Sequence, residues 1–120
     1  QLAVAIVVMN RVEDHRFPNT VCEVVQQGPT LAWTENFPVK NKCQFSWYCD
    51  GKSDKPKHKG KWENSLAVAS LVLAYKENIR DIAFILDGAT HYHADYVYPE
   101  WRKSKQKIVQ IGNHIFYKWV

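Results

Sequence analysis

The stretch Lys107-Ile-Val-Gln-Ile-Gly-Asn-His-Ile-Phe-Tyr-Lys-Trp119 decides the fold of the C-terminal part of the chain. Gly112-Asn113 lies between two runs that are rich in β-forming residues, and such a two-residue connection is typical of a β-hairpin. Upstream, Gly88-Ala-Thr-His-Tyr-His-Ala94 predicts a further short extended segment. Thr, His and Tyr therefore recur beside aromatic residues on two short segments. Hydrogen-bonding groups next to flat apolar rings are what a carbohydrate site needs.

Helical patterns dominate the chain before these strands. Leu2 to Met9 is apolar on every face and is either a buried helix or a buried strand, because periodicity alone does not separate the two. Thr20, followed three residues later by Glu23, predicts the N-cap of a short helix that ends near Gln27. These helices, with one small antiparallel sheet, favour an α+β domain of lysozyme type.

Two further elements are predicted in the middle of the chain. Residues 64–78 give the clearest helix, capped by Asn64 or Ser65, and their nearly all-apolar run predicts the central core helix. Cys43 to Cys49 alternates and is aromatic, which predicts a strand with Trp47 turned toward the core. The segment between Leu31 and Lys42 has little periodicity and is expected to be a loop.

Length and composition indicate one domain. The 120 residues contain 46% hydrophobic residues, enough for a modest core. The longest apolar run is shorter than the roughly 18–20 residues that a membrane-spanning helix requires, so we expect no membrane span. The sequence opens at Gln1 inside an element. We therefore expect residues 1–120 to be a single domain that is N-terminally incomplete.

Positive charge is concentrated in one segment. The net charge is +4, and the segment from Gly51 to Lys61 holds five lysines against Asp54 alone: Lys52, Lys55, Lys57, Lys59 and Lys61. Such a segment favours a polyanion, namely wall teichoic acid, lipopolysaccharide phosphate, peptidoglycan carboxylates or nucleic acid. A solvated loop kept soluble by its lysines is the equally weighted alternative. Nucleic acid ranks last among these partners, because no DNA-reading motif accompanies the lysines.

The cysteines and histidines indicate neither a metal nor a cofactor. Cys43 and Cys49 are close enough for a loop disulfide, which would leave Cys22 as a free thiol. His91, His93, Asp95 and His114 could in principle supply zinc ligands, but they have no recognised closed spacing. We therefore expect no metal site and no cofactor.

Three blocks of sequence closely resemble the SleB-like cell-wall hydrolases, which cleave the glycan strands of peptidoglycan. They follow the order of that family and cover nearly the whole chain, so the resemblance is specific. The first block is 1–12, the second combines 17–25 with 43–47, and the third combines 88–92, 99–101 and 112–117.

The resemblance implies a lysozyme-like fold and cleavage between N-acetylmuramic acid and N-acetylglucosamine, of lytic-transglycosylase or muramidase type. In such enzymes one glutamic acid protonates the leaving oxygen, and the muramic 6-hydroxyl then forms a 1,6-anhydro product. The family's glutamate precedes the helix that begins at Gln1, and none of the twelve carboxylates present aligns with it. We therefore expect the general acid upstream of Gln1. Glu35, in an aromatic-rich loop between Trp33 and Phe37, is a weaker candidate.

With the resemblance, seven residues become candidates for substrate binding. Each offers a hydrogen-bonding group within a matched block, and they are Gln44, Ser46, Thr90, His91, Tyr92, His114 and Tyr117. For His91 the alternative is a buried histidine that fixes a loop. Only one of His114 and Tyr117 is expected to face a ligand, because they lie on opposite faces of one strand. Trp101 is expected to be a packing anchor.

Two functional classes remain open. The first is a peptidoglycan hydrolase that acts in the bacterial cell wall or periplasm as a secreted, spore-associated or phage enzyme such as an endolysin. The second is a non-catalytic lysozyme-like module that binds the wall, or other virion or envelope proteins, within a phage particle or envelope assembly. A glutamate upstream of Gln1 would favour the enzyme.

Overall fold

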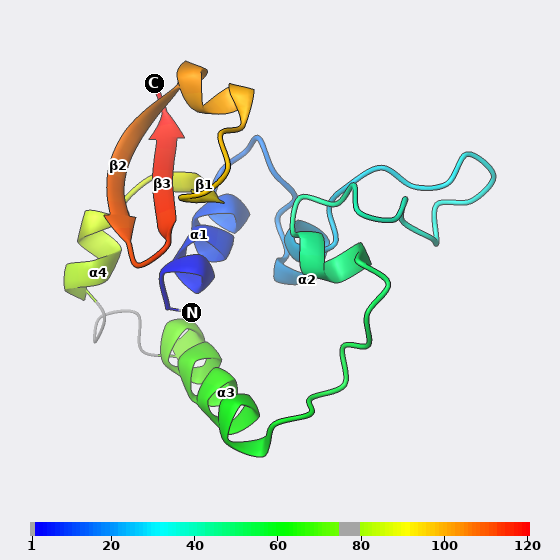
Figure 1. Cartoon of the computed structure of the whole chain (residues 1–120). Helices are drawn as coiled ribbons and strands as arrows, with labels where there is room; N and C mark the ends of the chain where they lie inside the picture. The colour runs from blue at the N-terminus through cyan, green and yellow to red at the C-terminus, as the bar shows by residue number, and fades with distance from the viewer. Residues whose placement is uncertain (1, 75–79) are drawn as a thin grey trace.

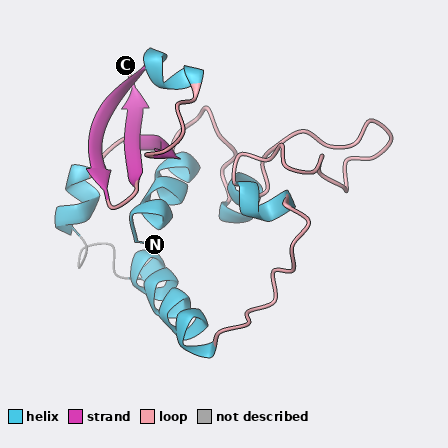
Figure 2. Ribbon diagram, viewed as in Figure 1, coloured by secondary structure: helices cyan, strands magenta, loops and turns pink. Residues whose placement is uncertain are grey.

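The computed structural model describes residues 2–74 and 80–120, which form helices around a three-stranded antiparallel sheet (Figures 1 and 2). The α-helices are α1 (Leu2–Glu13), α2 (Val21–Val25), α3 (Lys59–Ala74) and α4 (Arg80–Ile85). The strands are β1 (Ala89–Ala94), β2 (Lys105–Ile111) and β3 (His114–Trp119). Short 3₁₀-helices cover Ser46–Cys49 (η1) and Glu100–Ser104 (η3). Helices therefore precede the sheet, as the sequence predicts.

The sheet has the order β1-β3-β2, so β1 is an edge strand. The predicted hairpin is confirmed: β2 and β3 pair antiparallel from Lys105 with Trp119 to Ile111 with His114, and Gly112 takes the left-handed conformation at φ 57°. The extended segment predicted at 89–94 is also confirmed, as β1.

Helix α1 forms the centre of the core. Its buried residues Ala3, Ile6 and Val7 recur at helical spacing and pack in one cluster with Leu86 and Phe116. The apolar run at Leu2–Met9 is thus a helix, and it is buried against the sheet.

Helix α2 begins where the sequence predicts. Thr20 has extended backbone, and its Oγ1 accepts a hydrogen bond from the backbone N–H of Glu23 at 3.2 Å. The hydroxyl also donates to Glu23 Oε1 at 2.8 Å. This reciprocal pair satisfies a backbone donor that would otherwise lack a partner at the start of the helix.

Helix α3 differs from its prediction in two ways. It begins at Lys59, before Asn64, because His58 Nδ1 accepts from the backbone N–H of Lys61 at 3.2 Å and caps the first turn. The predicted continuation through 75–78 lies outside the described residues. The helix is also not the central core helix: among its described side chains only Val72 is buried. Its start also shortens the lysine-rich loop, since Lys59 and Lys61 belong to α3.

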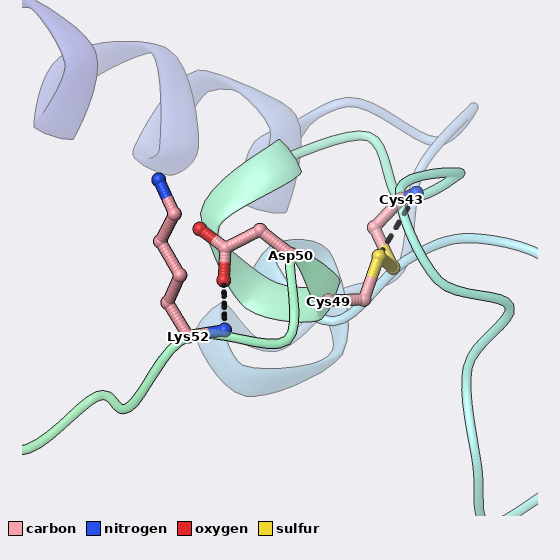
Figure 3. The surroundings of a disulfide bond; sticks show 4 residues. All are labelled: Cys43, Cys49, Asp50 and Lys52. Atoms are coloured by element: carbon pink, nitrogen blue, oxygen red, sulfur yellow. Dashed lines mark hydrogen bonds between the residues drawn. A yellow bond between two sulfur atoms is a disulfide. The ribbon is translucent and has the colours of Figure 1, made fainter.

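The strand predicted at Cys43–Cys49 is wrong. Cys43 and Cys49 form a disulfide with a Cα–Cα distance of 6.1 Å (Figure 3), whereas six residue steps of extended strand would span about 20 Å. The backbone N–H of Tyr48 instead donates to the Phe45 carbonyl at 3.0 Å, and η1 forms. Cys22 is free and exposed. We call residues 43–49 the disulfide loop.

The described helices include none with the length and apolar character that spanning a lipid bilayer requires.

Candidate functional site

An open groove of about 1160 Å³ lies where the edge strand, two helices and the disulfide loop meet. Helix α1 contributes Val4, Ala5 and Arg11, and α3 contributes residues from Trp62 to Ala69. The remaining lining comes from the disulfide loop, from the segment that runs from β1 to η3, and from His114 at the start of β3. The groove therefore joins all three sequence blocks that the resemblance singled out.

Tryptophan rings form much of the groove wall. Trp47, Trp62 and Trp101 all line it, together with Tyr92 and Tyr96. Trp47 is 48% exposed, which corrects its predicted core position. Because η1 replaces the expected strand, Phe45 takes the buried position of this loop and Trp47 turns to the groove. Flat apolar faces are thus presented at three places along one depression.

Five of the seven predicted binding residues share this lining: Gln44, Ser46, His91, Tyr92 and His114. Gln44 and Ser46 are exposed on the disulfide loop, and the Tyr92 and His114 rings meet edge to face at a centroid distance of 5.3 Å. The structure thus brings together polar groups from three separate segments beside the tryptophans.

Thr90 and Tyr117 lie beneath the groove and not in its lining, which differs from their predicted role. Both are buried, Thr90 at 1% exposure. The register between β1 and β3 shifts between Ala89 and His91, so simple alternation of faces fails there, and Ala89 and Thr90 are buried in succession. Their polar atoms contact the residues that do face the groove.

Thr90 supports His91. The Thr90 Oγ1 and His91 Nδ1 atoms are 2.9 Å apart. Phe17, Trp101 and Trp119 surround the half-buried imidazole, with ring centroids 5.2–6.0 Å away. Burial is the main cause that lowers the pKa of His91 to about 4, and the charges of Arg11 and Lys105 act in the same direction. His91 therefore presents a neutral ring at neutral pH.

Tyr117 supports His93, which the sequence analysis considered only as a metal ligand. His93 Nδ1 lies 2.7 Å from the Ala94 carbonyl, which only accepts, so Nδ1 is the donor there. In the neutral ring, Nε2 then accepts from the Tyr117 hydroxyl at 3.0 Å. Trp101 meets both His93 and Tyr117 edge to face, at 5.7 and 5.3 Å. The alternation of His91 and His93 on one strand was the signal that could have placed both on one face.

Arg11 lies in the groove lining and joins the elements around it, although the sequence analysis did not single it out. Its side chain is 4% exposed, and Nε donates to the Thr90 carbonyl. The guanidinium lies over the Phe17 and Phe45 rings at 4.8 and 5.1 Å. Burial lowers the pKa of Arg11 and raises the pKa of Tyr92. Arg11 thus places a largely buried positive charge in the groove lining.

The neighbouring residue fixes the start of the same strand. Asn10 Nδ2 donates to the carbonyls of Leu86 and Ala89, both at 2.9 Å. Helix α1 therefore holds the beginning of β1 by side-chain hydrogen bonds from two consecutive residues.

Within residues 2–74 and 80–120, no aspartate or glutamate lines the groove. Glu35, the weaker candidate for a general acid, is exposed on the loop at 29–42 and lies outside the lining. The described part of the groove thus offers uncharged hydrogen-bonding groups, aromatic faces and one buried cation.

This arrangement of helices, sheet and groove is similar to that of known proteins. The sequence profile of the family described as Cell Wall Hydrolase matches residues 1–117. The solved catalytic domain of the germination-specific lytic transglycosylase SleB from Bacillus anthracis is similar in structure, with a TM-score of 0.59 and 26% sequence identity. The match covers 98% of this chain and 76% of that one. No curated protein sequence matches the chain significantly. The resemblance to SleB-like hydrolases and the α+β lysozyme-like fold are thereby confirmed.

Proposed function

The chain belongs to the cell wall hydrolase family, and we propose that it cleaves peptidoglycan strands between N-acetylmuramic acid and N-acetylglucosamine. Family membership supports peptidoglycan hydrolysis in general terms, with the cell wall as the site of action. We propose, beyond this general activity, which glycosidic bond is cleaved and that the reaction is of lytic-transglycosylase type.

The observation that carries the proposal is the groove wall, which Trp47, Trp62 and Trp101 share with hydrogen-bonding side chains. A pyranose ring has apolar C–H faces and a rim of hydroxyl and acetamido groups, so it matches both kinds of surface. The volume of about 1160 Å³ exceeds the roughly 300–1,000 Å³ of a typical small-ligand pocket. Several consecutive sugars therefore fit along the groove.

We assign direct contacts with the glycan to Gln44, Ser46, His91, Tyr92 and His114. The neutral ring of His91 suits an uncharged sugar, since a buried imidazolium would need an anionic partner. Thr90 and Tyr117 become positioning residues, because they hold His91 and His93 by hydrogen bonds.

The general acid is proposed to be a glutamic acid that precedes Gln1. Val4 and Ala5 of α1 line the groove, so the N-terminal part of α1 borders the depression in which such a glutamic acid would act. The carboxyl would give its proton to the glycosidic oxygen as the C1–O bond breaks. The muramic 6-hydroxyl would then bond to C1 and return a proton to the carboxylate, which leaves the 1,6-anhydro end and a restored acid.

The test uses the protein with its natural N-terminal residues and purified peptidoglycan. Mass spectrometry of the released fragments is expected to show 1,6-anhydro-muramic ends, while reducing muramic ends would indicate a muramidase. Trp62→Ala is expected to reduce release, whereas the control Phe84→Ala removes an exposed ring outside the groove and is expected to leave it unchanged.

A second candidate is a non-catalytic module that binds the wall within a phage particle or envelope assembly. The observation that favours it is the lack of a carboxylate in the described groove lining. A protein that pellets with peptidoglycan through Trp62 but releases no fragments would establish this candidate and refute the enzyme.

A further inference from the structure

Residues 29–39 form a narrow projection that we call the aromatic finger. Its two sides are joined by hydrogen bonds from the Leu31 N–H to the Phe37 carbonyl and from the Val39 N–H to the Pro29 carbonyl, both at 2.9 Å. Thr30 and Pro38 form an isolated antiparallel bridge. The finger extends away from the helices and the sheet as the cyan loop of Figure 1.

The base of the finger is held against the disulfide loop. The backbone N–H of Asn41 donates to the Cys49 carbonyl at 2.9 Å, and that of Gln44 donates to the Gln27 carbonyl at 3.0 Å. Gly28 allows this approach, since a Cβ at that position would lie 2.9 Å from the Cys43 Cα. The finger thus projects from the segment that supplies Gln44, Ser46 and Trp47 to the groove.

Two aromatic rings are exposed at the end of the finger. Trp33 is 75% and Phe37 is 57% exposed, and their centroids are 6.2 Å apart. Thr34, Glu35 and Asn36 lie between them, and the Thr34 Oγ1 accepts from the Asn36 N–H at 3.1 Å. Aromatic faces beside hydrogen-bonding groups are the same combination that lines the groove.

Two lysines lie at the base of the finger. Lys40 and Lys42 are exposed there, and the exposed Lys52 follows the disulfide loop with its side chain directed away from the disulfide (Figure 3). The Lys40 side chain passes over Gly51, where a Cβ would lie 2.9 Å from its Cε. The start of the lysine-rich loop therefore adjoins the finger, and the combined surface favours an anionic partner.

We propose that the aromatic finger is a second glycan-binding site, which holds an outlying part of the peptidoglycan strand that occupies the groove. The proposal rests on the proposed function. Trp33 and Phe37 would stack on sugar faces, Glu35 and Asn36 would contact hydroxyl and acetamido groups, and the lysines would pair with carboxylates along the strand.

The composition of the tip favours a saccharide over a membrane. Glu35 is exposed between the two rings, so inserting both rings into lipid would carry a carboxylate into hydrocarbon, which is costly. A glycan strand leaves that carboxylate hydrated and hydrogen-bonded. Two contacts on one polymer also raise the affinity for long strands, because the second contact forms within the complex.

The test compares Trp33→Ala/Phe37→Ala with Phe84→Ala, whose target ring is 82% exposed but lies outside both the finger and the groove lining. Calorimetry, with the proposed upstream glutamic acid replaced by glutamine in every protein so that the strands stay intact, would measure the Kd for long peptide-free glycan strands and for a tetrasaccharide that fills the groove alone. We expect the double variant to lose about tenfold or more in affinity for long strands, with an unchanged Kd for the tetrasaccharide. The control should match wild type for both.

An unchanged Kd for long strands in the double variant would overturn the proposal. Binding to phosphatidylglycerol vesicles that the double variant abolishes would assign the finger to a membrane instead. The proposed function is refuted by a different result, namely that wild type releases no fragments from peptidoglycan. That result would not affect the finding that the finger contributes to strand binding. Because both rings are exposed, the thermal midpoint of the double variant should equal that of wild type and verify its folding.

Discussion

The lowered pKa of His91 makes the stability of the fold depend on pH in a predictable window. The imidazole titrates near 4 in the folded state and near 6.5 in an unfolded chain. Between these values the unfolded chain binds more protons, so the free energy of unfolding falls as pH falls from about 6.5 to 4. The stabilisation is complete above that window, where both states hold a neutral ring.

The magnitude follows from the same two values. A difference of about 2.5 pKa units corresponds to roughly 3.4 kcal/mol for a fully buried group. His91 is half-buried, so solvent screening reduces the effect to about half. We therefore expect His91 to contribute about 1 kcal/mol of the stability lost between pH 7 and pH 5.

Urea unfolding at pH 7, 6, 5 and 4.5 would measure this contribution by comparing wild type with His91→Phe. The phenylalanine keeps a ring among Phe17, Trp101 and Trp119 but does not titrate. All other groups titrate in both proteins, so the difference between the two pH dependences isolates His91. Parallel curves between pH 7 and pH 4.5 would refute the buried, neutral state of the ring.

Three further changes test the fold that holds the groove. Replacing Cys43 and Cys49 by serine opens a loop with a sequence separation of 6, which should lower the free energy of unfolding by about 2.2 kcal/mol; an unchanged urea midpoint would contradict this. Phe116→Ala removes a core ring that is 1% exposed and should cost about 3–5 kcal/mol in urea unfolding, so a loss below about 1 kcal/mol would place Phe116 outside the core. Thr20→Ala removes the α2 cap and should lower the unfolding free energy by about 1 kcal/mol, whereas an unaltered value would show that the cap does not stabilise α2.

The parts of the fold that the sequence predicts correctly are those set by local chemistry. Gly112 supplies the positive φ of the hairpin, and Thr20 with Glu23 supplies the cap of α2. Each of these residues lies within a few positions of the turn or cap that it forms. Their effect on the backbone therefore does not depend on how the segment packs against the rest of the fold.

The errors arise where tertiary contacts override local patterns. Alternating aromatic residues at 43–49 suggest a strand, but the disulfide brings the two ends within 6.1 Å and imposes a turn. The apolar run of α3 suggests a core helix, yet α1 occupies that position against the sheet. Thr90 turns inward because the β1–β3 register shifts beside it. None of these causes is visible within a single segment.

Arg11 shows why the three sequence blocks depend on one another. It belongs to the first block, its guanidinium covers Phe17 and Phe45 of the second, and its Nε donates to the Thr90 carbonyl of the third. A buried guanidinium is costly without partners, so the aromatic faces and the carbonyl must be in place together. Thr90 then positions His91, while Phe45 leaves Trp47 as the ring that faces the groove. One buried cation thereby couples core packing to the two walls on which a glycan strand would lie.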